Sequence, residues 1–272
     1  SMKTAKHPAL PFEITFDEPT HTYTDNEKTV YTSVTTFSAS YFPKFDAKAA
    51  AARIAARDNR LEMDILAEWD AKRDAAGIYG TRVHEYAEAI IDGTTPHKPE
   101  TDRERSAFRC VDKAIVSLSN LYEFLGTEKI VFDPLYALSG TIDLPARNKK
   151  TGALAILDWK TCETISGDNW GRMALPPIAH FLDSKQVKYQ MQLSSYAWLL
   201  TAGGSGYFPE DTPVETALIH IPHHETDPVW MPFGYEPEAV RAMVYDHQDR
   251  RLSDHLTETQ NQGIREKSEG LT

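Results

Sequence analysis

SGTID (residues 139–143) and AILDWKT (residues 155–161) are the two segments that decide how this chain is predicted to fold. Both consist of residues suited to strands, and the turn-rich segment RNKKTG at residues 147–152 lies between them, so together they predict a β-hairpin. In a twisted pair of strands, Asp143 and Asp158 can converge on one divalent cation. Lys160 points to the same face as Asp158, because side chains repeat along a strand with a period of two.

This pattern of acids and lysine favours a metal site. Two carboxylates offer hard oxygen ligands, which suit Mg²⁺ or Mn²⁺, and a lysine beside them can hold or deprotonate an attacking water. The alternative is an ordinary surface hairpin with exposed charges. Residues 154–157, Leu-Ala-Ile-Leu, make the approach to Asp158 apolar. Leaving two carboxylates there without a purpose would cost free energy, so we favour the metal site.

Two helical segments supply further candidates. In GTRVHEYAE (residues 80–88), a spacing of four places His84 and Glu88 on one helix face, and an imidazole there would complete the ligands of the metal. The alternative is a surface pair or a satisfied core pair. In KYQMQLSSY (residues 188–196), Gln192 and Tyr196 also share a face and could meet phosphate or brace Lys160. Their alternative is helix packing with a buried tyrosine.

In their order along the chain, the four motifs resemble the RecB-like branch of the PD-(D/E)XK nuclease superfamily: GxxxHxxxE at 80–88, GxxD at 140–143, DxKT at 158–161 and QxxxY at 192–196. That branch includes RecB nuclease domains, the mitochondrial genome maintenance exonuclease and many phage exonucleases. The resemblance covers about residues 21–221, and HTY at 21–23 and YTSVT at 31–35 look like the amino-terminal segment of the mitochondrial and phage members. It implies an α/β (α+β) fold with a restriction-endonuclease-like core, in which helices flank a mixed central β-sheet.

The resemblance also implies roles for individual residues. His84, Asp143 and Asp158 would bind Mg²⁺ or Mn²⁺ together with the main-chain carbonyl of Trp159, and Lys160 would serve the water. Gln192 and Tyr196 would support the catalytic site, and Glu88 is a supporting candidate only. The residues that we expect to contact DNA are Ser33, Arg53, Arg57, Arg82, Lys185 and Lys188.

The activity implied by this resemblance is that of a metal-dependent DNA exonuclease. Its substrate would be single-stranded or free-ended DNA, its role replication, recombination or repair, and its origin plausibly a phage. Two alternatives stay open: a structure-specific endonuclease, and a non-catalytic DNA-binding protein on the same fold. Several relatives hold an iron–sulfur cluster with four cysteines, whereas this chain has only Cys110 and Cys162, so we expect no such cluster.

The net charge of −11, from 29 basic and 40 acidic residues, runs against a nucleic-acid partner, which usually leaves a basic footprint. Part of the excess acid is assigned to the metal site, where a bound cation reverses the local field. We therefore expect a narrow basic channel in an otherwise acidic surface. The basic residues that would form it are Lys44, Lys48, Arg53, Arg57, Arg82, Lys160, Lys185 and Lys188. For Arg53 and Arg57, a solvated helix face is an equal alternative.

The remaining composition is typical of a soluble enzyme. A chain of 272 residues with 41% hydrophobic residues is long enough for one sizeable core. No apolar run reaches the roughly 18 to 20 residues of a membrane helix. Two cysteines far apart in sequence are typical of a reducing compartment. We therefore expect a cytoplasmic protein without membrane contact, in the host cytoplasm if the chain is phage-encoded.

Chain length predicts one domain over residues 1–272, and the resemblance implies that it is a nuclease domain. Its parts are N-terminal strands and a helix (1–60), the nuclease core (61–221), and a C-terminal hairpin, helix and flexible tail (222–272). We expect strands within 12–35, 128–137, 140–146, 153–159 and 216–221, and helices over 44–60, 62–91, 102–125 and 237–255, the second broken near Gly77 and Gly80. We expect a long loop at 162–184, whose Trp170 and Phe181 could stack on bases or anchor packing, and a frayed tail from 259.

Overall fold

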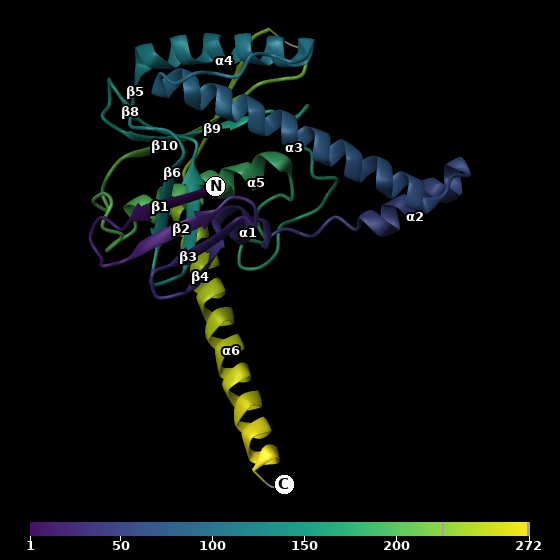
Figure 1. Cartoon of the computed structure of the whole chain (residues 1–272), viewed down its shortest axis with the longest axis vertical. Helices are drawn as coiled ribbons and strands as arrows, with labels where there is room; N and C mark the ends of the chain where they lie inside the picture. Colours follow the sequence, from purple (N-terminus) through teal and green to yellow (C-terminus); the bar gives the residue numbers. More distant parts are fainter. Residues whose placement is uncertain (225, 271–272) are drawn as a thin grey trace.

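The computed structural model describes residues 1–224 and 226–270 and contains two mixed sheets covered by helices (Figure 1). The first sheet has six strands in the order β1-β2-β3-β4-β7-β6, of which only β4 and β7 pair in parallel. These strands are β1 (Met2–Lys6), β2 (Glu13–Asp17), β3 (Thr22–Asp25), β4 (Val30–Ser33), β6 (Lys129–Asp133) and β7 (Leu138–Ile142).

The second sheet has five strands in the order β11-β10-β9-β8-β5, of which only β9 and β10 pair in parallel. These strands are β5 (Tyr122–Phe124), β8 (Leu144–Asn148), β9 (Leu154–Lys160), β10 (Val214–His220) and β11 (Val229–Phe233). The chain passes from the first sheet to the second at Asp143, the single residue between β7 and β8. The predicted mixed α/β architecture with flanking helices is therefore confirmed, with two mixed sheets in place of one.

Six helices surround the sheets within the described residues: α1 (Val34–Ala39), α2 (Ala47–Asp58), α3 (Glu62–Asp92), α4 (Asp102–Leu121), α5 (Lys185–Thr201) and α6 (Pro237–Glu269). The helices α3 and α4 lie side by side over the second sheet (Figure 1). The helix α2 and the first half of α3 form an arm that projects from the body, and the last turns of α6 project in another direction (Figure 1). Among the described residues, none of the helices combines the length and apolar character that a membrane span requires.

Strand β9 explains why an unbroken apolar run precedes Asp158. Leu154 and Ile156 face the core built around α5, whereas Ala155, Leu157 and Trp159 face the core beneath α3 and α4. A strand that is buried on both faces needs apolar residues at successive positions. By the same alternation, Asp158 and Lys160 lie on the α5 side of the sheet.

Several expected boundaries differ from the structure. The helix α3 continues through Gly77 and Gly80, so the expected break is wrong: a helical glycine costs only about 1 kcal/mol, which packing against α4 can offset. The helix α4 ends at Leu121, because the chain then joins the second sheet as β5.

The tail expected to fray from residue 259 is helical through Glu269, and residues 271–272 lie outside the described part. Strand β1 was not expected, since its sequence MKTAK carries no apolar alternation.

The loop at residues 162–184 contains no helix or named strand, as expected, and one isolated bridge joins Met173 to Leu182. Its two aromatic residues differ in environment. The side chain of Trp170 is 85% exposed, whereas Phe181 packs against the main core. Only Trp170 is therefore free to contact a partner from solvent.

Gly140 in β7 provides a test of how closely α1, α5 and the first sheet approach one another. A methyl group at this position would lie 2.5 Å from Cε1 of Tyr196 and 3.0 Å from Cγ2 of Val34. We expect Gly140→Ala to lower the free energy of unfolding by about 1–3 kcal/mol, because overpacking forces the neighbouring side chains to shift. The measurement is urea denaturation.

The matched control is Gly77→Ala in α3, where no atom lies within 4 Å of the added methyl group. This change should stabilise the protein by about 0.5–1 kcal/mol, because alanine is the better helix former. Equal unfolding midpoints for Gly140→Ala and the unsubstituted protein would contradict the packing described for β7.

Candidate active site

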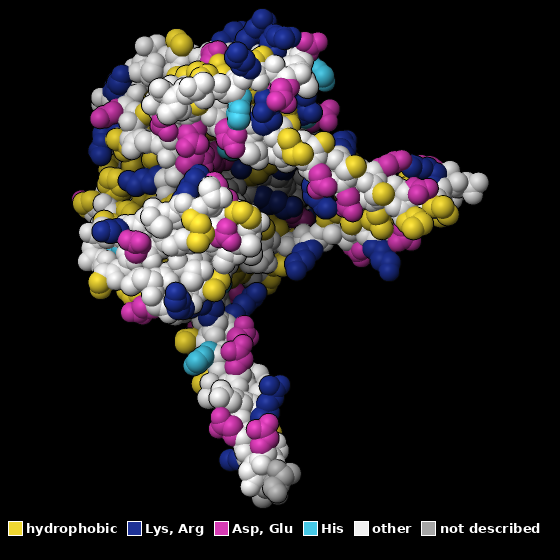
Figure 2. Space-filling view, viewed as in Figure 1, with side chains coloured by type: hydrophobic (Ala, Val, Ile, Leu, Met, Phe, Trp, Pro, Cys, Tyr) yellow, Lys and Arg dark blue, Asp and Glu magenta, His cyan; other side chains and the backbone are white. Residues whose placement is uncertain are grey.

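A pocket of about 640 Å³ lies where the N-terminal strands, α3, α5 and the junction of the two sheets meet. Figure 2 shows the surface hollowed between α3 and the N-terminal strands, with acidic and basic side chains around the hollow. The predicted site residues that line this pocket are Ser33, His84, Asp143, Asp158, Lys160, Gln192 and Tyr196. The structure therefore brings together residues that are far apart in sequence.

Asp143 is fixed at the junction of the two sheets. Its Oδ2 accepts a hydrogen bond of 3.0 Å from the main-chain N–H of Trp159 in β9. The same oxygen lies 3.3 Å from Nδ1 of His84. Burial disfavours the charged carboxylate, but the facing imidazole outweighs burial and lowers the pKa of Asp143. Asp143 is therefore an ionised, buried carboxylate that contacts β9 through the Trp159 amide and α3 through His84.

Asp158 and Lys160 project from β9 into the same pocket. Nζ of Lys160 lies 2.7 Å from Oδ2 of Asp158, whose side chain is only 5% exposed. That carboxylate oxygen nevertheless has no partner in hydrogen-bonding geometry. Burial and the nearby Asp143 carboxylate raise the pKa of Asp158 to about 6. Burial disfavours the Lys160 ammonium, but the carboxylates of Asp158 and Asp143 prevail and raise its pKa.

His84 approaches the two aspartates from α3. Burial disfavours the imidazolium form, yet the Asp143 carboxylate outweighs burial and raises the pKa of His84 to about 9. Glu88, one turn further along α3, does not line the main pocket. It lines an adjacent space of about 310 Å³, which it shares with His84, Glu85 and Glu128.

Gln192 and Tyr196 line the pocket from α5. Nε2 of Gln192 donates a hydrogen bond of 3.3 Å to the hydroxyl of Tyr196. Burial, followed by the charge of Asp158, raises the pKa of Tyr196 well above its ordinary value, so this hydroxyl stays protonated. The pair therefore offers neutral hydrogen-bonding groups on the side of the pocket next to Asp158.

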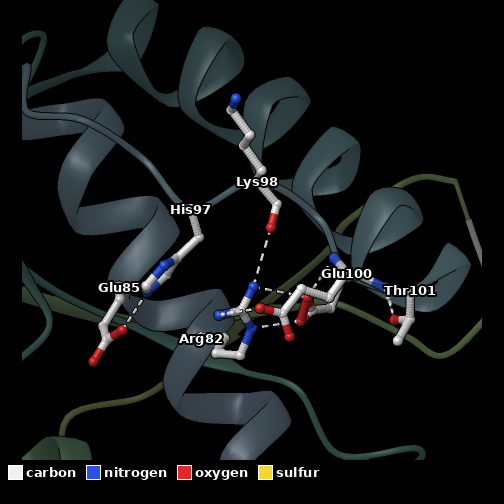
Figure 3. Close-up of polar contacts among 7 residues, drawn as sticks. Arg82, Glu85, His97, Lys98, Glu100 and Thr101 are labelled. Atoms are coloured by element: carbon white, nitrogen blue, oxygen red, sulfur yellow. Dashed lines mark hydrogen bonds and ion pairs between the residues drawn. The ribbon is translucent and has the colours of Figure 1, made fainter.

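Arg82 lies on α3 two residues before His84, but its guanidinium is turned toward the loop before α4 (Figure 3). Its Nε donates a 2.7 Å hydrogen bond to the buried Glu104, and Nη2 donates to the carbonyl of Lys98 at 3.1 Å. A second carboxylate, Glu100, lies 3.6 Å from Nη1 (Figure 3). A DNA phosphate would have to compete with these partners.

Of the other residues expected to contact DNA, Ser33 lines the pocket, and Lys185, Lys188, Arg53 and Arg57 do not. Ser33 also caps α1 by accepting a hydrogen bond from the amide of Thr36. Nζ of Lys185 donates to the carbonyl of Thr164, and Nζ of Lys188 lies 3.3 Å from Asp183. Arg53 and Arg57 lie on the projecting helix α2, where Arg57 forms an ion pair with Asp58.

Glu128 is a pocket residue that the sequence analysis missed. It precedes β6, has a positive φ of 48°, and its N–H donates a 3.0 Å hydrogen bond to the carbonyl of Asp143. Burial and the Asp143 carboxylate raise the pKa of Glu128 to about 8. One ligand atom from each of His84, Glu128 and Asp143 lies within 4.8 Å of the others. No local motif marks Glu128, because a turn 15 residues before Asp143 places it there.

The donor set of this pocket fits a divalent cation. Carboxylate oxygens with one imidazole are ligands that Mg²⁺ and Mn²⁺ accept. Oδ2 of Asp158 is buried and faces the Lys160 ammonium at 2.7 Å without hydrogen-bonding geometry, which leaves this oxygen available to a metal ion. The pocket can therefore bind a metal ion.

One comparison with known proteins identifies a family. The family model described as the PD-(D/E)XK nuclease superfamily matches residues 55–270. One similar solved structure is titled "Crystal structure of SSO0001", with 15% sequence identity, a TM-score of 0.25, and coverage of 61% of this chain and 72% of that chain. No curated protein matches.

The position of His84 leads to a prediction about metal binding. If His84 is a ligand, His84→Ala should weaken Mn²⁺ binding by roughly 10-fold or more, since loss of even an indirect contact to a metal costs about that much. Isothermal titration calorimetry measures the affinity. His97→Ala is the matched control, because His97 contacts Glu85 and does not line the pocket. Unchanged affinity in His84→Ala would assign this imidazole a structural role.

Proposed function

Because the chain belongs to the PD-(D/E)XK nuclease superfamily, we propose that it is a metal-dependent DNA exonuclease similar to the RecB-like branch. Its substrate is single-stranded or free-ended DNA. The observation that carries the proposal is the meeting of Asp143, Asp158 and Lys160 in one pocket, with Lys160 Nζ 2.7 Å from Asp158. The proposal places the activity in replication, recombination or repair, in the cytoplasm of a phage host.

The acidic residues provide the metal site of the proposed mechanism. Asp143, Asp158, His84 and the main-chain carbonyl of Trp159 would hold Mg²⁺ or Mn²⁺. The chemistry that such a cation supplies is Lewis-acid polarisation of the scissile phosphate. The hydrogen bond from the Trp159 amide holds Asp143 in place, so its carboxylate needs no rearrangement when substrate arrives.

Lys160 acts on the attacking water in this proposal. Since its pKa is raised, the ammonium remains charged and orients the water as a hydrogen-bond donor. The same positive charge offsets the negative charge that grows on phosphate in the transition state. Gln192 and Tyr196 border the pocket on the α5 side and hold the phosphate or Lys160 in position. No covalent enzyme intermediate is required.

The choice of a single strand rests on charge and on the shape of the site. A protein with a net charge of −11 attracts duplex DNA poorly, and in our proposal the pocket between α3 and the N-terminal strands takes one strand from its end. The exposed Trp170 in the loop after β9 offers a surface on which bases can stack. The closest alternative is a structure-specific endonuclease on the same site.

The first functional prediction concerns the three central residues. Asp143→Ala, Asp158→Ala and Lys160→Ala should each reduce cleavage by at least ~100-fold, because each removes a metal ligand or a preorganised charge. The assay follows end-labelled single-stranded DNA with Mn²⁺ at saturating concentration, and circular dichroism checks the fold. Lys149→Ala is a useful comparison, since Lys149 contacts the carbonyl of Ser119, does not line the pocket and should lose far less activity. Normal turnover in any of the three central variants would contradict the assigned site.

The second functional prediction separates the exonuclease from the endonuclease. We expect progressive shortening of linear single-stranded DNA, and slower cleavage of blunt duplex because the net negative charge disfavours duplex binding. Salt should inhibit cleavage, because each phosphate contact releases counterions. A covalently closed single-stranded circle of the same sequence is the matched substrate. Cleavage of the circle at the rate of the linear strand would replace the exonuclease proposal with the endonuclease one.

A further inference from the structure

The ammonium of Lys160 has two neighbours of different kinds. Its Nζ lies 2.7 Å from Oδ2 of Asp158, but not in hydrogen-bonding geometry. The same atom lies over the ring of Tyr189, 4.7 Å from the ring centroid. A lysine side chain has many rotamers, and holding it in one of them costs conformational entropy. The ring of Tyr189 is therefore a second contact that restricts where this ammonium can lie.

Tyr189 contacts Lys160 from outside the pocket. It lies on α5 three residues before Gln192 and seven before Tyr196, a spacing that puts these three side chains on one side of the helix. Gln192 and Tyr196 line the pocket, whereas Tyr189 does not. The ring of Tyr189 is half-buried and packs against the main core. Tyr189 can therefore act on the lysine without touching a substrate in the pocket.

Both partners of this contact are held by their surroundings. The hydroxyl of Tyr189 lies 3.6 Å from Sγ of Cys162, which follows Lys160 by two residues. Burial, followed by the charge of Cys162, raises the pKa of Tyr189, so its hydroxyl stays protonated. His220 of β10 pairs in register with Lys160, and its Nε2 lies 2.6 Å from the carbonyl oxygen of Cys162. The end of β9 is thus tied both to β10 and to the ring on α5.

An aromatic ring is a suitable partner for this ammonium. The face of the ring is negative, and its attraction for a cation grows where water is excluded. The side chain of Lys160 is only 20% exposed. In the proposed function, Asp158 is also a metal ligand, so its carboxylate serves two cations. The neutral ring of Tyr189 is the contact of Lys160 that does not have to be shared.

We propose that Tyr189 is a positioning residue, whose ring holds the Lys160 ammonium in the place from which it orients the attacking water. This inference rests on the proposed nuclease function and adds to it a residue outside the pocket. Because the ring acts on a preorganised charge, its loss should lower kcat and leave KM unchanged.

The test weakens the negative face of the ring while keeping its shape. Position 189 is filled with phenylalanine and then with phenylalanines that carry one, two and three ring fluorines. The kcat for linear single-stranded DNA at saturating Mn²⁺ should fall with each fluorine, to roughly one tenth with three, at constant KM. Tyr189→Phe retains the ring and should retain most of the activity, whereas Tyr189→Leu should lose about 10-fold.

The matched control is the same fluorinated series at Tyr136, which is half-buried against the same core and does not line the pocket. This series should leave kcat unchanged. A flat series at position 189 would overturn the inference, because packing alone does not depend on the charge of the ring face. Unchanged kcat in a folded Tyr189→Leu variant would do the same. If that variant fails to fold, the fluorinated series still decides, because it preserves the shape of the ring.

A second readout does not depend on cleavage. In protein labelled with ¹³C at the lysine Cε, the Lys160 signal is identified by its loss in Lys160→Arg. The ring current of Tyr189 should shift this signal upfield, and Tyr189→Leu should remove the shift. An unshifted Lys160 signal in the unsubstituted protein would overturn the inference. Cleavage with a flat fluorinated series would refute only the role of Tyr189, whereas a shifted signal without any cleavage would refute the nuclease proposal and with it that role.

Discussion

The hydrogen bond from the Trp159 amide to the Asp143 carboxylate is the contact on which the rest of the pocket depends. Asp143 is the single residue between β7 in one sheet and β8 in the other, and Trp159 belongs to the central strand β9. The bond ties the crossing point of the two sheets to the strand that carries Asp158 and Lys160. Because side chains alternate along β9, the geometry of this one bond fixes which acids face each other.

The same arrangement concentrates negative charge that the protein alone compensates only in part. Asp143, Asp158 and Glu128 line one pocket with His84 and Lys160 as cations. The compensation is unequal: the pKa of Asp143 is lowered, so its charge is well compensated, whereas the pKa of Asp158 is raised. His84 and Lys160 each contact one of the aspartates, and Glu128 contacts neither cation closely enough for an ion pair. Electrostatic repulsion of this kind favours uptake of cations, and metal binding should then also stabilise the fold.

Sequence patterns predicted the parts of this site that follow local periodicity. Asp158 and Lys160 share a strand face, and His84 and Gln192 lie on helices that were expected. Glu128 could not be found in this way, since a turn in the folded chain brings it to Asp143. The hydrogen bond between Arg82 and Glu104 could not be predicted from the sequence either, because Glu104 lies 22 residues away on another helix. The low helix propensity of glycine predicted a break near Gly77 and Gly80, but α3 is continuous there. Packing of α3 against α4 outweighs the cost of the two glycines.

Residues 1–54 lie outside the segment that the family model matches, yet they build one wall of the pocket. Strand β4 pairs with the start of β7 at Leu138 and Ser139, and the hydroxyl of Tyr23 lies 2.7 Å from Oγ1 of Thr141. The ring of Tyr23 stacks on Phe16 with a centroid distance of 4.4 Å, which makes this wall rigid. Asp158 and Lys160 line the same pocket as this wall and α3. The matched segment therefore supplies most of the reactive groups, whereas the width of their entrance depends on how the N-terminal strands pack against β7.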